Sequence, residues 1–286
     1  SKRKLIQLVK EGYVKGWDDP RMPTLSALRR RGVPPEAIHD FCRRIGMAKS
    51  EAVVEYGLLE FCIREYLNAH APRWMAVLNP VRLVIDNYPE DQEDVFEMPL
   101  YPDDDSFGSR KVPFTRELYI DRDDFRLDPP KKYYRLAPGQ EVRLRYAYFV
   151  TCTDVVKDAE GNVQEIHCTY DPASRGGNSP DGGRKVKGTI HWVSAAHCVE
   201  AEVRLYDKLF TEANMNAIPE GSDYKDYLNP ESVVVRKGCK LEESLKDAKP
   251  GEKFQFVRTG FFTPDSKNPG VYNRVVTLRD SFKPAK

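Results

Sequence analysis

The stretch KKYYRLAPGQEVRLRYAYFV, residues 131–150, joins a basic aromatic segment to a strand pattern. A proline–glycine pair at residues 138–139 predicts a turn between the two halves. Over residues 141–150 apolar side chains alternate with arginines, and a period of two among aromatic and β-branched residues predicts one half-buried β-strand. Arg143 and Arg145 would then lie side by side on the open face of a sheet.

The basic half of this stretch carries side chains that suit unpaired nucleotides. Lys131, Lys132 and Arg135 surround two tyrosines, of which Tyr134 is next to the arginine. Guanidinium groups match base edges and phosphates, and aromatic rings stack on unpaired bases. Two interpretations remain open at this point. One is a nucleic-acid-binding surface, and the other is a solvated strand face whose charges contact only water.

Length and composition describe an ordinary globular chain. Its 286 residues suffice for two domains, and 40% are hydrophobic, 31% are charged and the net charge is +1. The chain is not basic overall, so any nucleic-acid contact must use local patches. Six cysteines form no CxxC pair, which is typical of reduced thiols in a cytosolic protein. We find no apolar run of the roughly 20 residues that cross a bilayer and no signal peptide, and we expect a cytoplasmic protein.

Helical patterns occupy residues 1–70. The basic tetrapeptide at residues 1–4 is interpreted as a solvated tail. The following three helices are predicted from apolar spacing and from proline and glycine boundaries: Leu25–Arg31 ended by Gly32, a helix from Pro34–Pro35 ended by Gly46, and one from Ser50–Glu51 to about Ala69. Residues 29–31 are all arginine, and they are either a charged helix face or a contact to backbone phosphates.

From Trp74 onward the pattern changes to short strands. Residues 150–156 and 163–170 flank a turn and predict a hairpin. The other predicted strands are 75–78, 81–85, 95–98, 112–114, 117–120, 186–193, 201–206, 233–235, 254–261 and 271–278, with a short helix at 241–248. So many short strands separated by turns predict β-sandwiches or barrels.

Catalytic and metal-binding motifs are not evident. The histidine and cysteine residues at 167–168, 191 and 197–198 fit no common zinc spacing, so we expect no metal site. There is no glycine-rich phosphate loop in a strand-then-helix context and no clustered nucleophile and base, which an independent hydrolase would need. Acidic runs at 103–105 and 121–124 are interpreted as solvated faces.

RNA binding is therefore the hypothesis that the residues themselves favour, with a β-barrel interaction module without an RNA role as the alternative. Arginine, lysine and glutamine read base edges or phosphates. The candidate contacts are Arg73, Lys132, Tyr134, Arg135, Arg143, Arg145, Gln255, Arg258 and Arg279.

Several longer segments resemble a known family. GWDDPRMPTLSALRRRG, GSRKVPF, DPPKKYYRLAPGQEVRLRYAY, VKGTIHWVSAAHCVEAEVRLYDKLF, EKFQFVRTGFF and YNRVVTLRDS resemble the C-terminal part of bacterial glutaminyl-tRNA synthetases, which are class I enzymes. The resemblance covers nearly the whole chain, and the near alternative is a eukaryotic-type glutamyl-tRNA synthetase.

The resemblance implies a mainly β fold with an N-terminal helical subdomain. It implies two six-stranded-type β-barrels, proximal and distal, with the distal barrel inserted in the proximal one. The implied boundaries are 1–72 for the helical subdomain, 73–128 with 211–286 for the proximal barrel, and 129–210 for the distal barrel.

The resemblance also implies a role for each candidate residue in binding an anticodon stem-loop of tRNA(Gln). Arg135 corresponds to the reader of the third anticodon base and Arg143 to the reader of the first. Lys132 stands where a glutamine helps to read the middle base, and Tyr134 replaces a lysine. The remaining contacts surround the middle uracil or line the stem and loop, and they are Arg73, Gln255, Asn68, Arg145, Arg258 and Arg279.

Ser1 and Lys2 resemble the end of the family's KMSKS-like loop, which stabilises the reacting phosphates of ATP. The resemblance further implies a Rossmann catalytic domain, which this sequence does not contain. We therefore expect the chain to be inactive by itself, to bind no cofactor, and to act as a monomer with the catalytic domain of its parent chain. ATP and magnesium would belong to the parent enzyme.

Overall fold

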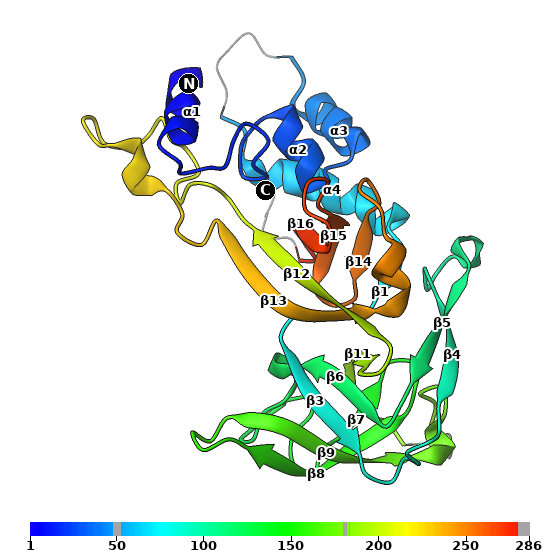
Figure 1. Cartoon of the computed structure of the whole chain (residues 1–286). Helices are drawn as coiled ribbons and strands as arrows, with labels where there is room; N and C mark the ends of the chain where they lie inside the picture. The colour runs from blue at the N-terminus through cyan, green and yellow to red at the C-terminus, as the bar shows by residue number, and fades with distance from the viewer. Residues whose placement is uncertain (48–52, 180–181, 183, 280–286) are drawn as a thin grey trace. The chain divides into compact units, whose positions relative to one another are not determined.

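The computed structural model of the chain describes residues 1–47, 53–179, 182 and 184–279 (Figure 1). Over these residues the chain is mainly β, with four short α-helices near the N-terminus and two nearly closed, barrel-like sheets. This confirms the predicted fold class. No helix in the described part of the chain has the length and apolar character needed to cross a membrane.

The chain divides into two compact units. Unit 1 comprises Ser1–Ala71, Glu202–Val235 and Lys249–Lys286, and unit 2 comprises Pro72–Ala201 and Arg236–Ala248. Each unit is built from segments that are distant in sequence. The sheet of unit 2 takes strands from both sides of the predicted boundary at residue 128, and the predicted domain boundaries stay a prediction.

The helices of unit 1 begin and end at residues that the sequence marks. They are α1 (Lys2–Lys10), α2 (Leu25–Arg31), α3 (Pro35–Ile45) and α4 (Tyr56–His70). At the start of α2 the Thr24 hydroxyl accepts a hydrogen bond from the Ala27 amide at 3.1 Å. At its end Gly32 adopts a φ of +97°, in the left-handed region that glycine favours. The predicted bounds of α2 and α3 are confirmed.

Two predictions in the N-terminal part, a solvated tail and the start of the third predicted helix, were wrong. The first residues form α1 rather than a tail, because Leu5, Leu8 and Val9 provide an apolar face that packs in a core cluster with Met22. The helix α4 begins at Tyr56, since Val53–Glu55 are not helical, and its predicted start at Ser50–Glu51 lies outside the described residues.

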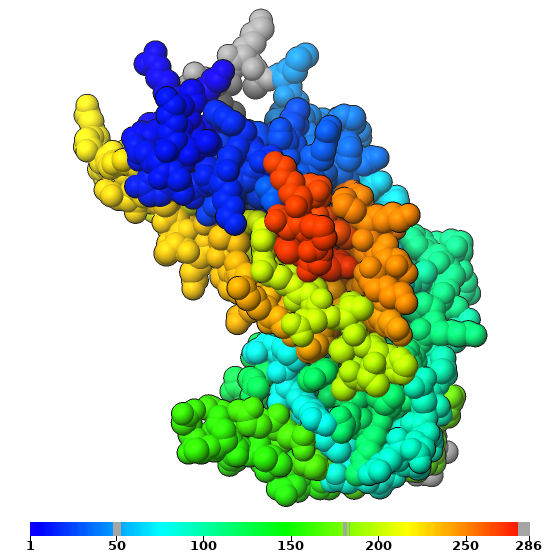
Figure 2. Space-filling model, viewed as in Figure 1, coloured from blue at the N-terminus to red at the C-terminus, as the bar shows by residue number. Residues whose placement is uncertain are grey.

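The core of unit 1 joins its helices to its strands. Ile63 and Leu67 of α4 share a buried cluster with Phe261 and with Val275. In Figure 1 the helices α2 and α4 lie against the red strand β16, and in the space-filling view of Figure 2 the blue and red parts of the unit are in contact. Arg31 is buried with them, and its guanidinium donates to the Val275 carbonyl at 3.1 Å.

Four strands of unit 1 lie in the order β14, β15, β16 and β12. β16 is antiparallel to β15 and parallel to β12. Their bounds are β12 (Cys198–Tyr206, within the unit from residue 202), β14 (Phe254–Phe256), β15 (Gly260–Pro264) and β16 (Val271–Thr277).

The main sheet of unit 2 has the strand order β10, β7, β8, β9, β3, β6 and β11. Their bounds are β3 (Pro80–Ile85), β6 (Glu117–Asp121), β7 (Glu141–Leu144), β8 (Phe149–Lys157), β9 (Val163–Asp171), β10 (Thr189–Ile190) and β11 (Trp192–Ser194). The predicted β8–β9 hairpin is confirmed, with Lys157 opposite Val163 at its turn. The remaining strands that begin or end in this unit are β1 (Arg73–Trp74), β2 (Ala76–Val77), β4 (Asp94–Pro99), β5 (Ser109–Phe114) and β13 (Val233–Glu242).

Aromatic side chains fill the core of unit 2. Phe114 contacts the rings of Tyr88, Phe96, Tyr148 and Trp192 in edge-to-face arrangements, with centroids 5.0–5.9 Å apart. Such pairs add stability beyond the apolar area that they bury. The phenol groups of Tyr88 and Tyr148 both donate to the Asp94 carboxylate, so their polar ends are satisfied.

Several strand predictions differ from the structure in the same way. Each of the stretches 141–150, 186–193 and 254–261 contains two short strands rather than one. Apolar residues continue on both sides of each break, and buried residues lie at or next to it, such as Ala147, His191 and Val257, so periodicity alone does not reveal the break. The short helix predicted at 241–248 is a 3₁₀ helix, η5 (Glu243–Asp247), and β13 is much longer than the predicted strand at 233–235.

Candidate nucleic-acid interface

Residues 141–150 form a hairpin instead of a single strand. Tyr146 has a φ of +60°, and the Leu144 amide donates to the Tyr148 carbonyl at 2.8 Å, so the chain reverses there. Arg143 consequently pairs with Phe149 on the returning strand. Arg145 lies in the turn, and the two arginines are not neighbours on one strand face as predicted. The predicted turn at residues 138–139 is confirmed, with a φ of +73° at the glycine.

Among the residues that the structure describes, Arg143 is held by packing rather than by an ion pair. Its guanidinium carbon lies 5.3 Å from the centre of the Phe149 ring, within the range of a cation–π contact. Its Nε is buried without a hydrogen-bond partner among the described residues. Gly177 closes the other side, where an added Cβ would lie 3.2 Å from Arg143 Cδ. The half-buried side chain is thus held in one direction, and its terminal N–H groups can donate to an acceptor group of a ligand.

Arg73 and Arg145 form a second basic group in unit 2. The guanidinium carbon of Arg73 lies 4.5 Å from the Tyr101 ring centre, and that of Arg145 lies 5.0 Å from the Tyr146 ring centre. Burial, together with the positive charge of Arg73, lowers the pKa of Arg145. A cation that is disfavoured by burial and by a second cation favours an anionic ligand beside it.

Arg135 is exposed but partly engaged within the protein. It donates to the Asp123 carbonyl at 2.9 Å, and its Nε lies 3.4 Å from the buried Asp124 carboxylate. These contacts fix the direction of the guanidinium while leaving further donors of its planar fork for a ligand.

Lys132 and Tyr134 line an open cavity of about 510 Å³ in unit 2. Both side chains are exposed, and Tyr134 exposes 48% of its surface. The ammonium group of Lys187 lies 5.2 Å from the centre of the Tyr134 ring. The structure thus brings these two predicted residues to one cavity and adds a lysine that the sequence analysis did not select.

The remaining candidates belong to unit 1. Gln255 lies on β14 and exposes only 7% of its surface, while Arg258 is exposed in the β14–β15 turn. Asn68 is exposed near the end of α4, and Arg279 is exposed just after β16. Ser1 and Lys2 are exposed at the start of α1. Their predicted contacts stay predictions.

Comparison with known proteins agrees with these features. Residues 71–171 and 189–265 match the family described as tRNA synthetases class I (E and Q), anti-codon binding domain, and residues 1–69 match the catalytic domain of the same family. The chain belongs to the class I tRNA synthetases of the E and Q type.

Individual relatives of this synthetase family cover the chain almost completely. The chain is 54% identical to the glutamine–tRNA ligase of Bradyrhizobium diazoefficiens and 53% identical to those of Clostridium kluyveri and Pseudomonas syringae. These similarities span 99% of the chain but only 50–51% of each relative. The chain therefore spans about half the length of the curated relatives it matches.

Positive backbone φ angles occur at or next to residues implied by the family resemblance. Among described residues other than glycine, a positive φ occurs at Lys132 (65°), Tyr146 (60°) and Arg258 (66°). Lys132 and Arg258 are predicted RNA contacts, and Tyr146 follows a third, Arg145. Strained conformations of this kind cost about 1–3 kcal/mol and collect at ligand-binding sites, which supports the assignment of these turns to binding.

The groups that position the basic side chains were not predicted from the sequence. Tyr101 and Phe149 hold Arg73 and Arg143, and Lys185 and Lys187 join Lys132 at its cavity. The sequence does carry a signal for the two lysines, because they alternate with valine in RKVKG, directly after a glycine-rich loop. The sequence carries no such signal for the two aromatic residues, since their contacts with the arginines depend on which strands are neighbours.

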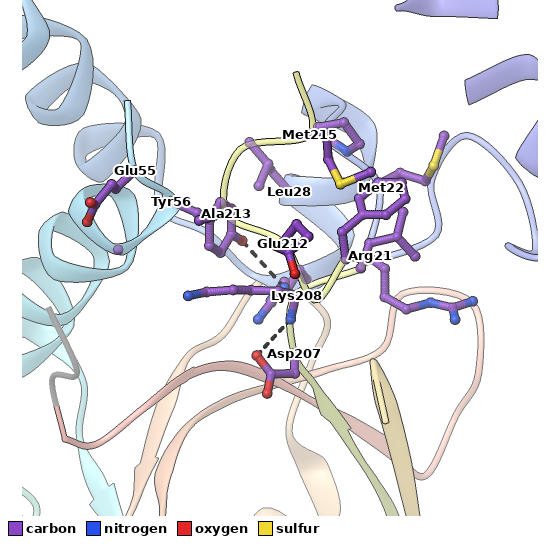
Figure 3. Close-up of a pocket in the computed structure, with 15 residues that line it drawn as sticks. Arg21, Met22, Leu28, Glu55, Tyr56, Asp207, Lys208, Glu212, Ala213 and Met215 are labelled. Carbon is purple, nitrogen blue, oxygen red and sulfur yellow. Dashed lines mark hydrogen bonds between the residues drawn. The ribbon is translucent and has the colours of Figure 1, made fainter. Parts of the chain in front are cut away.

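A different cavity, of about 360 Å³, lies in unit 1 (Figure 3). Figure 3 shows Met22, Leu28 and Met215 grouped on one side of it, with Lys208 below. The lining is mainly apolar, and no predicted RNA contact is among the described residues that form it. It is not part of the candidate interface.

Proposed function

We propose that the chain recognises the anticodon of tRNA(Gln). It would serve as the anticodon-binding part of a cytoplasmic enzyme that attaches glutamine to this tRNA with ATP and magnesium. The chain spans about half the length of its relatives. Attachment of the amino acid would therefore require parent-enzyme residues that this chain does not include.

The conformation of Arg143 carries the proposal. Its guanidinium is stacked on Phe149 and has a buried Nε without a partner among the described residues. Some arginines of this protein have their charge neutralised internally, as Arg110 does by pairing with Glu242 at 2.7 Å. Arg143 forms no ion pair with a described residue, so its charge and its terminal N–H groups can meet an acceptor from a ligand, and base edges and phosphates are such acceptors.

The arrangement supports selective reading of unstacked bases. Each two-point arginine contact to a base edge discriminates against a wrong base by about 1–3 kcal/mol. Arg143 and Arg135 are both held in a fixed direction before RNA binds, so little side-chain entropy is lost when they meet a base. A nearly neutral protein can thus bind one anticodon selectively.

Substitution of these arginines tests the proposal. We expect Arg143→Ala and Arg135→Ala each to weaken binding of a fluorescent tRNA(Gln) anticodon stem-loop by about 1–3 kcal/mol, or roughly 5- to 150-fold, measured by fluorescence anisotropy. Arg116→Ala provides a control, because Arg116 is paired with Glu90 at 3.1 Å and lines no candidate site. Equal affinity of the wild type and both arginine variants would contradict the proposal.

A glutamyl-tRNA synthetase remains the competing function, because the matched family covers both the E and the Q enzymes. Glutamine and glutamate codons differ at the first letter, which pairs with the third anticodon base. This is the base that the family resemblance assigns to Arg135. We expect the wild type to prefer a tRNA(Gln) over a tRNA(Glu) stem-loop and Arg135→Ala to lose part of this preference. The opposite preference would favour the glutamate enzyme.

A β-barrel module without an RNA role is the second alternative. Titration of total tRNA at two salt concentrations separates it from the proposed function, because phosphate contacts make binding depend steeply on salt. Absence of tRNA binding at low salt would favour the protein-interaction role.

A further inference from the structure

The cavity beside Tyr134 has a basic rim formed by two separate segments of unit 2. One segment contributes Pro130, Lys132 and Tyr134, and the other contributes Lys185 and Lys187. The three lysines are exposed, and none forms an ion pair with a residue that the structure describes. The acidic neighbour in the lining, Glu141, is already paired with Arg184 at 3.2 Å. The rim is therefore positively charged.

Gly188 places the second segment directly against the first. A Cβ at this position would lie 2.9 Å from the Tyr134 carbonyl carbon and closer still to its oxygen, so only glycine allows this approach. The Gly188 carbonyl also accepts a hydrogen bond from the Arg143 amide at 2.8 Å. The position of the two lysines is thus tied to the backbone on which Tyr134 and Arg143 lie.

Lys187 also fixes the ring of Tyr134. Its ammonium group lies over the ring at 5.2 Å from the centre, and Tyr134 still exposes 48% of its surface. With the lysine on one side, the exposed remainder of the ring is available for stacking by an unpaired base.

We propose that Lys185 and Lys187 bind the sugar–phosphate backbone of single-stranded RNA beside the nucleotide that stacks on Tyr134. The inference rests on the proposed anticodon-binding function and adds a phosphate-contacting edge to it. Lysine acts as a compact point charge and does not distinguish base edges. Lys185 and Lys187 supply affinity and position the strand, while the arginines supply discrimination.

The salt dependence of binding tests whether the two lysines contact phosphates while the arginines discriminate between bases. The probe is the fluorescent tRNA(Gln) anticodon stem-loop, titrated with the 286-residue chain over a range of salt concentrations. Each lost phosphate contact lowers the slope of log affinity against log salt by about 0.7 for a single strand. The double variant Lys185→Ala/Lys187→Ala is expected to lower the slope by about 1.4, so a fourfold rise in salt weakens its binding roughly sevenfold less than that of the wild type.

Two further variants and a second probe complete the test. Lys157→Ala removes an exposed lysine at the far end of β8, roughly 25 Å along the strand from Phe149, and should keep the wild-type slope. Lys185→Arg/Lys187→Arg keeps both charges and should also retain it. With a stem-loop of altered anticodon, the double alanine variant should weaken binding by the same factor as with the cognate one, whereas Arg143→Ala should reduce the difference between the two probes.

The outcomes separate this inference from the proposed function. If the wild type binds and Arg143→Ala weakens binding, but the double alanine variant keeps the wild-type slope, the phosphate-binding edge is refuted and anticodon binding stands. A double variant that loses discrimination without a change in slope would also refute it. If the wild type binds no stem-loop, the proposed function fails and this inference fails with it.

Discussion

Two hairpins, β7–β8 in unit 2 and β14–β15 in unit 1, are built alike but present different side chains. Both reverse at a residue other than glycine with a positive φ, Tyr146 at 60° and Arg258 at 66°. The first hairpin carries Arg143 on an aromatic ring with an unused donor, and the second carries Gln255, which is almost fully buried.

The difference shows two ways of holding a polar group for recognition. A charged guanidinium is expensive to bury, so β7–β8 leaves it half-exposed and orients it by stacking on a ring. A neutral amide costs less to bury, so β14–β15 can enclose Gln255 within the sheet. The half-exposed guanidinium of β7–β8 favours phosphates and other hydrogen-bond acceptors in general. The enclosed amide of β14–β15 favours an uncharged ligand group that fits closely against it.

The largest expected effect is a loss of stability that distinguishes an arginine in a buried ion pair from an arginine proposed to bind a ligand. Arg110→Ala should lower the free energy of unfolding by about 3–5 kcal/mol, because it leaves the buried Glu242 carboxylate without its partner. Arg143→Ala should lower it by less than about 1 kcal/mol, since only the stacking on Phe149 is lost. Urea unfolding measures both. Equal losses would remove the distinction between the two kinds of arginine.

The shared turn geometry of the two hairpins can be tested next. Valine is strongly disfavoured at positive φ, whereas asparagine tolerates it. Tyr146→Val and Arg258→Val should therefore each be about 1–2 kcal/mol less stable than the corresponding asparagine variant, as measured by urea unfolding. Comparison with asparagine cancels the contacts of the lost side chain. A difference in one hairpin alone would show that the two turns are not equivalent.

A smaller effect is expected from the aromatic support of Arg73. Tyr101→Leu should weaken stem-loop binding by about 0.5–1 kcal/mol, because the cation–π contact at 4.5 Å is lost and the guanidinium becomes less ordered. Tyr101→Phe keeps the ring and should bind like the wild type, measured by fluorescence anisotropy. If the phenylalanine variant were as weak as the leucine variant, the hydroxyl rather than the ring would be the important group.

The smallest effect concerns pH and belongs to unit 2. The hydrogen bond to Asp86, at 2.8 Å, and the one to Glu165 raise the pKa of His167 above its ordinary value of 6.5. The stabilisation is complete below pH 6.5 and is lost as the pH rises through the folded-state pKa. It should stay below about 1 kcal/mol at this partly exposed site.

Urea unfolding of the wild type and His167→Gln across this pH range measures the effect. The difference in stability between the two proteins should shrink as the pH rises. A difference in stability that does not change with pH would mean that His167 stabilises the protein independently of its charge.

Local sequence signals predicted the parts of the fold that local physics controls. Gly32 and Gly46 ended helices where expected, and the turn after Lys157 joined the two strands predicted on either side of it. The stretch at residues 141–150 was misinterpreted, because alternation of apolar residues continues on both sides of Tyr146 and a positive φ at tyrosine has no sequence signature. The same reason explains the missed break at Arg258.

The sequence by itself determined the mainly β class, the helical N-terminal part and the types of residue available to contact RNA, because propensity, periodicity and side-chain chemistry are local properties. Only the tertiary structure decided which of these residues are held ready for a ligand. Arg143 depends on Phe149 and Gly177, and Lys187 depends on the close approach of Gly188 to Tyr134. Phe149 faces Arg143 across a hairpin, whereas Gly177 and Gly188 come from segments far from their partners in the chain, and strand pairing rather than sequence spacing brings each contact together.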